Sequence, residues 1–235
     1  MEYIIIIIIC VIAIVLLKIG FNVKINDIKK IKEIGYDKEL NKIADKFEDN
    51  KEICKKILDK LGNKAVQIEE NSDTKSSLYI ALSNKIIIAN IKDTFTRIQT
   101  IAHECLHSVQ SRRILMFNFI FSNIFLLYFI AAIFLILFNV GNNLMLYIEI
   151  YTILAIIYCA VRNYLETEAM SKAIFVAKEY MEDYAKENKE IAQDDIDTLT
   201  NNFDILNKIG IPMTNFSLVV GTIVKMIILA VLALI

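Results

Sequence analysis

Four long runs of apolar residues dominate the pattern of the chain, and they cover residues 3–17, 115–138, 144–161 and 216–235. Each run approaches the ~20 residues that an α-helix needs to cross a bilayer, and the first is the shortest. The pattern therefore predicts about four transmembrane helices. A cleaved signal peptide is the alternative for the first run. However, the only charge ahead of it is Glu2 and no small-residue cleavage site precedes Lys18, which favours an uncleaved anchor.

The polar segments between these runs have periodicities of their own. Apolar residues recur at threes and fours in residues 38–49 and 51–62, which predicts two helices. Short strands are expected at residues 65–69, 77–82 and 85–89. The last two strands are expected to form a hairpin. A later amphipathic helix is predicted from about Asp194 to Lys208. Together the elements indicate a mainly α membrane protein with a small α+β part.

Composition supports a membrane protein and excludes one class of partner. Hydrophobic residues make up 56% of the chain and the mean hydropathy is +0.49, which is far too apolar for an ordinary soluble protein. The net charge is −1 and no basic stripe with interleaved aromatic residues occurs, so no nucleic acid is expected as a partner. The four cysteines form no CxxC pair, which indicates free thiols in a reducing compartment. The composition does not indicate an oligomeric state.

Basic residues predict the orientation in the membrane. Of the 26 lysines and arginines, 19 lie between residues 18 and 113, six lie between 162 and 208, and none lies in the loop 139–143. Because basic residues near span ends are retained in the cytoplasm, we expect both polar segments there and both termini outside. This indicates a multi-pass protein of the cell membrane. Only two charged residues interrupt the spans, Glu149 and Lys225, and both are expected to reach the bilayer surface by snorkelling.

The predicted orientation divides the chain into five parts. An N-terminal membrane anchor (1–20) precedes a cytoplasmic α+β part (21–113), a transmembrane hairpin (114–162), cytoplasmic helices (163–215) and a C-terminal transmembrane helix (216–235).

The only two histidines of the chain, His103 and His107, are four residues apart, and Glu104 directly follows the first. On a helix, residues four apart share one face, so both imidazoles reach one point in space. Zinc binds imidazole nitrogens and keeps a position for water, which a neighbouring carboxylate can deprotonate. The alternative is two surface or core histidines that fall at this spacing by chance. The HExxH pattern favours a zinc site with His103 and His107 as ligands and Glu104 as the base.

Two histidines and a water leave tetrahedral zinc one protein ligand short. Glu166 and Glu168 follow the second and third spans, on the same predicted side of the membrane. Steps of three and four lead from Glu166 along an apolar stripe of Met170, Ala173, Ala177, Met181 and Tyr184. The stripe from Glu168 is largely polar and contains Lys172, Phe175, Glu179 and Glu182. Because a carboxylate on a buried face is costly unless it is paired or binds a metal, Glu166 is the expected ligand. Glu168 is expected to be a surface charge or a partner of a ligand histidine.

Three segments resemble a known family. AHECLHSVQ (102–110), KKILDKLG (55–62) and ETEAMSKA (166–173) are similar to segments of the YugP-like neutral zinc metallopeptidases of bacterial membranes, which are themselves similar to HtpX-type membrane gluzincins. The resemblance covers most of the chain and implies a gluzincin-like catalytic part with zinc on His103, His107 and Glu166, and Glu104 as general base. Leu106 departs from the family pattern by replacing a glycine, and Met170 by replacing a serine.

The resemblance implies a membrane-embedded endopeptidase in which Glu104 activates a zinc-bound water to attack a peptide bond. Its substrate would be a peptide or a membrane protein, and a strand beside the metal helix can pair with an extended peptide. The chain has no third histidine to stabilise the oxyanion. Arg162, Tyr164 and Tyr79 are the candidate donors, and none of them is assigned. The alternative is a metal-binding membrane scaffold with little or no activity, against which the intact Glu104 argues.

Overall fold

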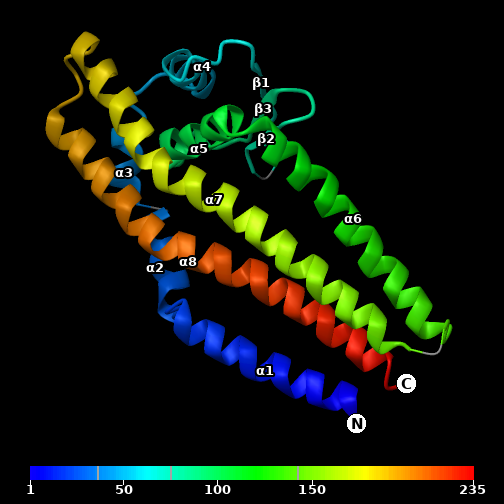
Figure 1. Cartoon of the computed structure of the whole chain (residues 1–235). Helices are drawn as coiled ribbons and strands as arrows, with labels where there is room; N and C mark the ends of the chain where they lie inside the picture. The colour runs from blue at the N-terminus through cyan, green and yellow to red at the C-terminus, as the bar shows by residue number, and fades with distance from the viewer. Residues whose placement is uncertain (36, 75, 142) are drawn as a thin grey trace. The chain divides into compact units, whose positions relative to one another are not determined.

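The computed structural model describes residues 1–35, 37–74, 76–141 and 143–235. Tyr36, Lys75 and Asn142 lie outside the described residues, and Asn142 belongs to the predicted outer loop. It is mainly helical with one small sheet (Figure 1). The helices are α1 (Glu2–Gly20), α2 (Ile25–Gly35), α3 (Lys38–Ala44), α4 (Asn50–Lys60), α5 (Arg97–Val109), α6 (Arg112–Leu137), α7 (Met145–Glu187) and α8 (Gln193–Leu232). The strands are β1 (Gln67–Glu70), β2 (Leu78–Ile80) and β3 (Lys85–Ile88).

The chain forms two compact units. The first comprises Met1–Val23, Met116–Tyr164 and Ile211–Ile235, and the second comprises Lys24–Leu115 and Leu165–Gly210. Four of the described helices, α1, α6, α7 and α8, are long and apolar enough to cross a membrane, which agrees with the four predicted runs and is consistent with a membrane protein. Helices α7 and α8 continue well beyond the predicted spans. Pro212 lies inside α8, where the sequence analysis ended one helix and began another.

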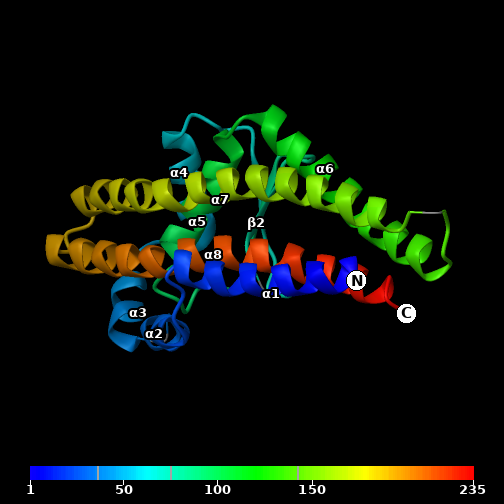
Figure 2. The same ribbon diagram turned by 60° about the horizontal axis from the view of Figure 1, so that its bottom comes forward.

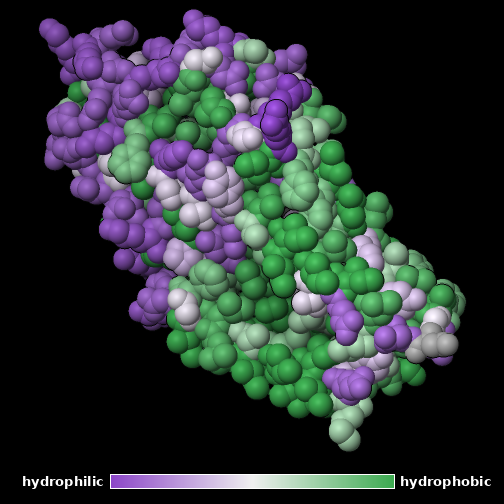
Figure 3. Space-filling view, in the orientation of Figure 1, coloured by the Kyte–Doolittle hydropathy of each residue, from purple (hydrophilic) through white to green (hydrophobic). Residues whose placement is uncertain are grey.

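Aromatic side chains hold the first unit together. The ring of Phe125 on α6 stacks on Tyr151 at 5.0 Å and on Tyr158 at 4.9 Å between centroids, both on α7. The hydroxyl of Tyr151 donates a hydrogen bond to the backbone oxygen of Thr222 on α8 at 3.1 Å. Helix α1 runs beside the C-terminal half of α8 in both ribbon views (Figure 2), where Phe21 meets Phe216 edge to face. Hydrophobic residues form a broad area over these two segments on the face in Figure 3, as a lipid-exposed surface requires.

The second unit contains a three-stranded sheet with the order β1-β3-β2. Strands β2 and β3 are antiparallel, which confirms the predicted hairpin, whereas β1 pairs with β3 in parallel. Ile86 and Ile88 of the central strand are buried and pack in one core with residues of α4 and α5. Strand β2 is an edge strand that lies beside α5. The fold class is thus as predicted in its coarse form, while the gluzincin-like character of this unit stays a prediction.

Arg97 fixes the start of α5 to the connection between α3 and α4. Its side chain is buried, and its two terminal nitrogens donate four hydrogen bonds. Their acceptors are the backbone oxygens of Ala44, Phe47 and Glu48 and the amide oxygen of Asn50, at 2.7 to 2.9 Å. Burial lowers the pKa of Arg97. The first turn of the helix that carries both histidines is therefore tied to two preceding helices.

The four cysteines are free thiols, as predicted. Cys54 of α4 and Cys105 of α5 lie with their sulfur atoms 3.6 Å apart in the core of the second unit. Burial raises the pKa of the Cys105 thiol, so it stays protonated and behaves as a small apolar side chain. The compartment stays a prediction.

Candidate metal centre

Helix α5 presents both histidines on one face. The Nε2 atoms of His103 and His107 are 3.0 Å apart, and their rings meet edge to face with centroids 4.5 Å apart. The spacing of four residues places them one turn apart, as the sequence predicts. Two imidazole nitrogens this close to one point form half of a tetrahedral metal site.

Glu166 of α7 brings a carboxylate to the same point. Its Oε2 is 3.4 Å from Nε2 of His103 and 3.8 Å from Nε2 of His107. The three side chains are only 12 to 18% exposed. They form a group that can hold a metal ion, with one ligand atom each and all three atoms within 4.8 Å of one another. The structure therefore brings together the three residues expected as ligands.

The separations of these atoms suit zinc. Zinc about 2.0–2.1 Å from nitrogen and oxygen ligands places neighbouring tetrahedral ligands about 3.3–3.4 Å apart. The observed separations of 3.0, 3.4 and 3.8 Å lie on both sides of that value. Three atoms at these separations lie on a circle of radius about 2.0 Å, so one ion can stand at zinc distance from all of them. The donor set alone does not identify the metal, because other divalent ions accept the same ligands.

The burial of α7 explains why Glu166 and not Glu168 reaches this point. Along the predicted apolar stripe, Ala173, Ala177 and Met181 are buried, whereas Phe175 on the other stripe is 74% exposed. The oxygen atoms of Glu168 accept hydrogen bonds from Lys172 at 2.6 Å and from Gln110 at 3.0 Å. The hydrogen bond from Lys172 is the main cause of a lowered pKa for Glu168. Glu168 thus stays ionised, and it is linked to the ligand His107 through Gln110.

Gln110 links Glu168 to the ligand histidine, and the sequence analysis gave it no role. Its amide nitrogen donates to the backbone oxygen of Leu165 at 2.9 Å and to Glu168, so its amide oxygen must face the other way. That oxygen lies 2.8 Å from Nδ1 of His107. An amide oxygen only accepts, so Nδ1 of His107 carries the proton and Nε2 keeps its lone pair for a metal. Its position three residues after His107 was the signal available in the sequence, and in the structure it is the C-cap residue of α5.

The electrostatics of His107 follow from these contacts. Burial alone lowers its pKa, but hydrogen bonds with Glu166 and Gln110 outweigh burial and raise the pKa of His107. The anionic Glu166 therefore favours positive charge at this point, whether on a protonated imidazole or on a metal ion.

Glu104 directly follows His103 on α5 and is only 7% exposed. Burial raises the pKa of its carboxyl group, while the two histidines and the Tyr79 backbone oppose that rise. The Tyr79 contact is a hydrogen bond from its backbone to the carboxylate, so Glu104 borders the edge strand β2. A buried carboxylate with a raised pKa beside a metal-binding group has the properties of a general base.

Of the three residues considered as oxyanion donors, one has its hydroxyl engaged and the other two belong to the first unit. The hydroxyl of Tyr79 donates to the amide oxygen of Asn84 at 2.9 Å, within the turn of the hairpin. Arg162 and Tyr164 belong to the first unit, and Tyr164 is 54% exposed. Leu106, which replaces the glycine of the family pattern, packs in the core of the second unit. The structure therefore assigns none of these residues to an oxyanion.

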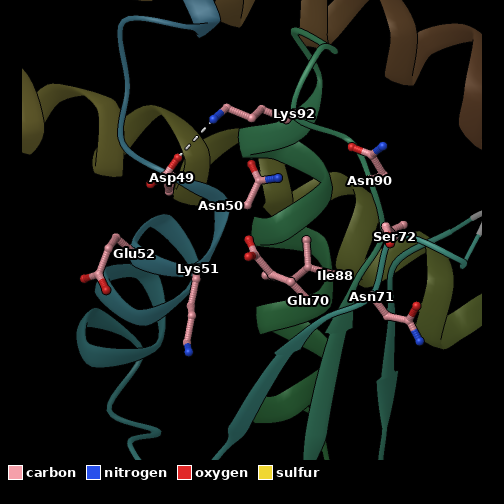
Figure 4. A pocket seen from close by; sticks show the side chains of 11 residues that line it. Asp49, Asn50, Lys51, Glu52, Glu70, Asn71, Ser72, Ile88, Asn90 and Lys92 are labelled. Carbon is pink, nitrogen blue, oxygen red and sulfur yellow. Dashed lines mark hydrogen bonds and ion pairs between the residues drawn. The ribbon is translucent and has the colours of Figure 1, made fainter.

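A separate cavity of about 480 Å³ lies where β1 and β3 end and α4 begins (Figure 4). Its described lining includes none of the three metal-group residues. Acidic and basic side chains both line it, namely Asp49, Lys51, Glu52, Glu70 and Lys92. The ammonium of Lys92 is 3.4 Å from the carboxylate of Asp49. These opposed charges give the cavity no clear preference for an anion or a cation, and we assign it no ligand.

Comparison of the chain with protein-family models, with curated proteins and with solved structures gives no match. We therefore infer the function from the geometry of the site.

Proposed function

We propose that the chain is a membrane-embedded zinc-dependent endopeptidase. The observation that carries the proposal is the convergence of His103, His107 and Glu166, with the buried carboxylate of Glu104 next to it. A site that served only to hold a metal would not need an additional buried carboxylate beside its ligands. This combination favours hydrolysis over a purely structural role, and it agrees with the family resemblance of the HExxH segment.

Each residue has a defined task in this proposal. His103, His107 and Glu166 would hold the ion, which would lower the pKa of water and polarise the scissile carbonyl. Glu104 accepts a proton on its carboxylate as water attacks the carbonyl carbon, and it delivers that proton to the leaving amine. Gln110 keeps the proton of His107 on Nδ1, so that Nε2 faces the ion.

Strand β2 is the proposed substrate platform. It is an edge strand in the order β1-β3-β2, and the backbone of Tyr79 in β2 contacts Glu104. A peptide that extends this sheet would be held by main-chain hydrogen bonds, with little selectivity for its side chains. Its scissile bond would then run past the base. Unfolded segments of membrane proteins or extended peptides are therefore the proposed substrate class.

The metal half of the proposal predicts about one zinc per chain after purification with zinc present. Glu166→Gln should lower zinc affinity by at least ~10-fold, because a neutral amide is a poor ligand for a divalent cation. Glu168→Gln is the matched control on the same helix, and its loss should be clearly smaller because Glu168 contacts Gln110 and not the ion. Elemental analysis and zinc titration measure both. Equal losses from the two variants would contradict the assignment of Glu166, and a zinc-free wild-type protein would contradict the site.

The catalytic half is tested by hydrolysis of unfolded peptides and membrane proteins at neutral pH in detergent. The zinc-loaded chain should cleave some of these substrates, lose the activity with a chelator, and regain it when zinc is added back. Absence of cleavage by the zinc-loaded chain across the panel would favour the metal-binding scaffold instead.

The charge distribution supports a cytoplasmic site in a multi-pass protein of the cell membrane. In a chain whose native cysteines are changed to alanine, an impermeant maleimide on intact cells should miss Lys46→Cys and Asn188→Cys and label Asn143→Cys. Permeabilised cells provide the control, since all three positions should then react. Labelling of Lys46→Cys from outside, with protection of Asn143→Cys, would reverse the orientation.

A further inference from the structure

Lys225 lies in the middle of the last apolar run. It is ten residues before Ile235 and nine after Phe216, so about 15 Å of helix separates it from either end of the run. The hydrocarbon core of a bilayer is about 30 Å thick, which places the Cα atom of Lys225 near the midplane. Snorkelling was the expectation for this residue, but the structure turns its ammonium toward aromatic rings instead.

The ammonium of Lys225 lies over two phenylalanine rings. Its Nζ is 5.5 Å from the ring centroid of Phe125 and 5.6 Å from that of Phe129. Both rings belong to the middle of α6, so they hold the ammonium at the depth of the lysine backbone. Cation–π contacts of this kind are attractive, and they strengthen when water is excluded.

The charge of Lys225 has no counter-ion among the described residues, since no carboxylate lies within 4.0 Å of its Nζ. The acidic residues of the first unit are Glu2 and Glu149, and they are the first residue of α1 and the fifth of α7. Glu2 lies at a helix end. Glu149 lies three residues before Thr152, whose hydroxyl is 3.2 Å from Sδ of Met226, so Glu149 stands about one helical turn from the depth of Lys225. An ionisable side chain at this depth normally pairs with an opposite charge or marks a functional surface.

One face of α8 beside Lys225 is exposed over its whole apolar length. Its residues are Thr214, Ser217, Gly221, Val224, Ile228 and Val231. The intervals alternate between three and four, which is the spacing of a helix-packing seam. A Cβ atom built on Gly221 meets nothing within 4 Å, so another backbone can approach closely there. Lys225 directly follows Val224 and stands at the border between this exposed face and the packed face of Thr222, Leu229 and Ala230.

We infer that this face of α8 binds the transmembrane helix of another protein, and that an aspartate or glutamate near the middle of that helix pairs with Lys225. A second copy of this chain would have to present Glu149 from about one helical turn away from this depth, so a helix with a central carboxylate fits better. An anionic lipid headgroup would require the ammonium to leave the phenylalanine rings for the bilayer surface. The inference does not depend on zinc binding or on hydrolysis.

The test measures energy transfer between the labelled full-length chain and synthetic transmembrane helices in phosphatidylcholine vesicles. Three leucine-alanine peptides serve as probes, with aspartate at the centre, asparagine at the centre, or aspartate near one end. The central aspartate should bind the wild type about tenfold more tightly than it binds Lys225→Met. Lys18→Met, which removes a lysine near the end of α1, is the matched control and should bind as the wild type does.

Two further variants keep the inference falsifiable. Gly221→Leu fills the open approach without touching the charge, and it should weaken binding while helix content and thermal unfolding stay unchanged. Lys225→Glu should lose the aspartate peptide and gain a peptide with central lysine. Equal binding of the central aspartate to wild type and Lys225→Met would overturn the inference. So would equal binding of the central and terminal aspartate peptides, or association that requires anionic lipid.

Discussion

Glu104→Gln is expected to keep zinc on the purified chain and to lower peptide hydrolysis by at least ~10²-fold. The substitution preserves the size of the side chain and its capacity to accept a hydrogen bond from the Tyr79 backbone. It removes the carboxylate that takes a proton from water. Because Glu104 is not one of the three ligands, the metal content should stay near that of the wild type.

The measurement compares kcat/KM of the variant with that of the wild type on a peptide that the wild type cleaves, at neutral pH and with zinc saturated. Glu182→Gln is a matched control, since it makes the same change at a half-exposed side chain of α7 whose charge partner is Lys178. Its activity should equal that of the wild type. Unchanged cleavage by Glu104→Gln would point to a contaminating protease or to another base, and loss of zinc would show that the variant disturbs the site itself.

The three ligand residues were predictable because each was inferred from the helical repeat within one segment of the chain. His103 and His107 share a helix face through their spacing of four residues. Glu166 followed from the contrast of two stripes on one helix, and the burial of Ala177 against the exposure of Phe175 confirms that contrast. Such arguments depend only on the helical repeat and on the cost of an isolated buried carboxylate. The catalytic role of Glu104 is not tested by the geometry and stays a prediction.

Features that depend on distant partners were not predictable in the same way. Gln110 was missed because its two acceptors, Leu165 and Glu168, are 55 and 58 residues away in the sequence. The parallel pairing of β1 with β3 was likewise not predictable, because these strands are not consecutive in the chain. The local pattern of a strand does not indicate which other strand it pairs with or in which direction. Lys225 shows the same limit: its phenylalanine rings lie on α6, almost 100 residues earlier. No local period relates those positions.

The same limit applies to Arg97, which the sequence analysis did not single out. Arg97→Met should destabilise the second unit by about 3–5 kcal/mol, because four buried or part-buried acceptors lose the hydrogen bond from the guanidinium at once. Three of these acceptors are backbone oxygens at and just after the C-terminal end of α3, and of these the Ala44 oxygen also accepts from the backbone nitrogen of Phe47 at 3.2 Å. Methionine fills part of the volume and supplies no hydrogen bond.

Arg97→Lys should destabilise the unit less than methionine does but still measurably, because one ammonium cannot reproduce the planar fork that reaches all four acceptors. Arg113→Met is the matched control on the exposed start of α6, and its effect should stay within about 0.5 kcal/mol. Denaturant unfolding in detergent, followed by hydrogen exchange in α5, measures the loss. Since Arg97 precedes His103 by six residues on the same helix, zinc affinity should fall in the same order as stability. Wild-type stability in Arg97→Met would show that water replaces the guanidinium at these oxygens, and full zinc affinity despite lost stability would separate the metal centre from the start of α5.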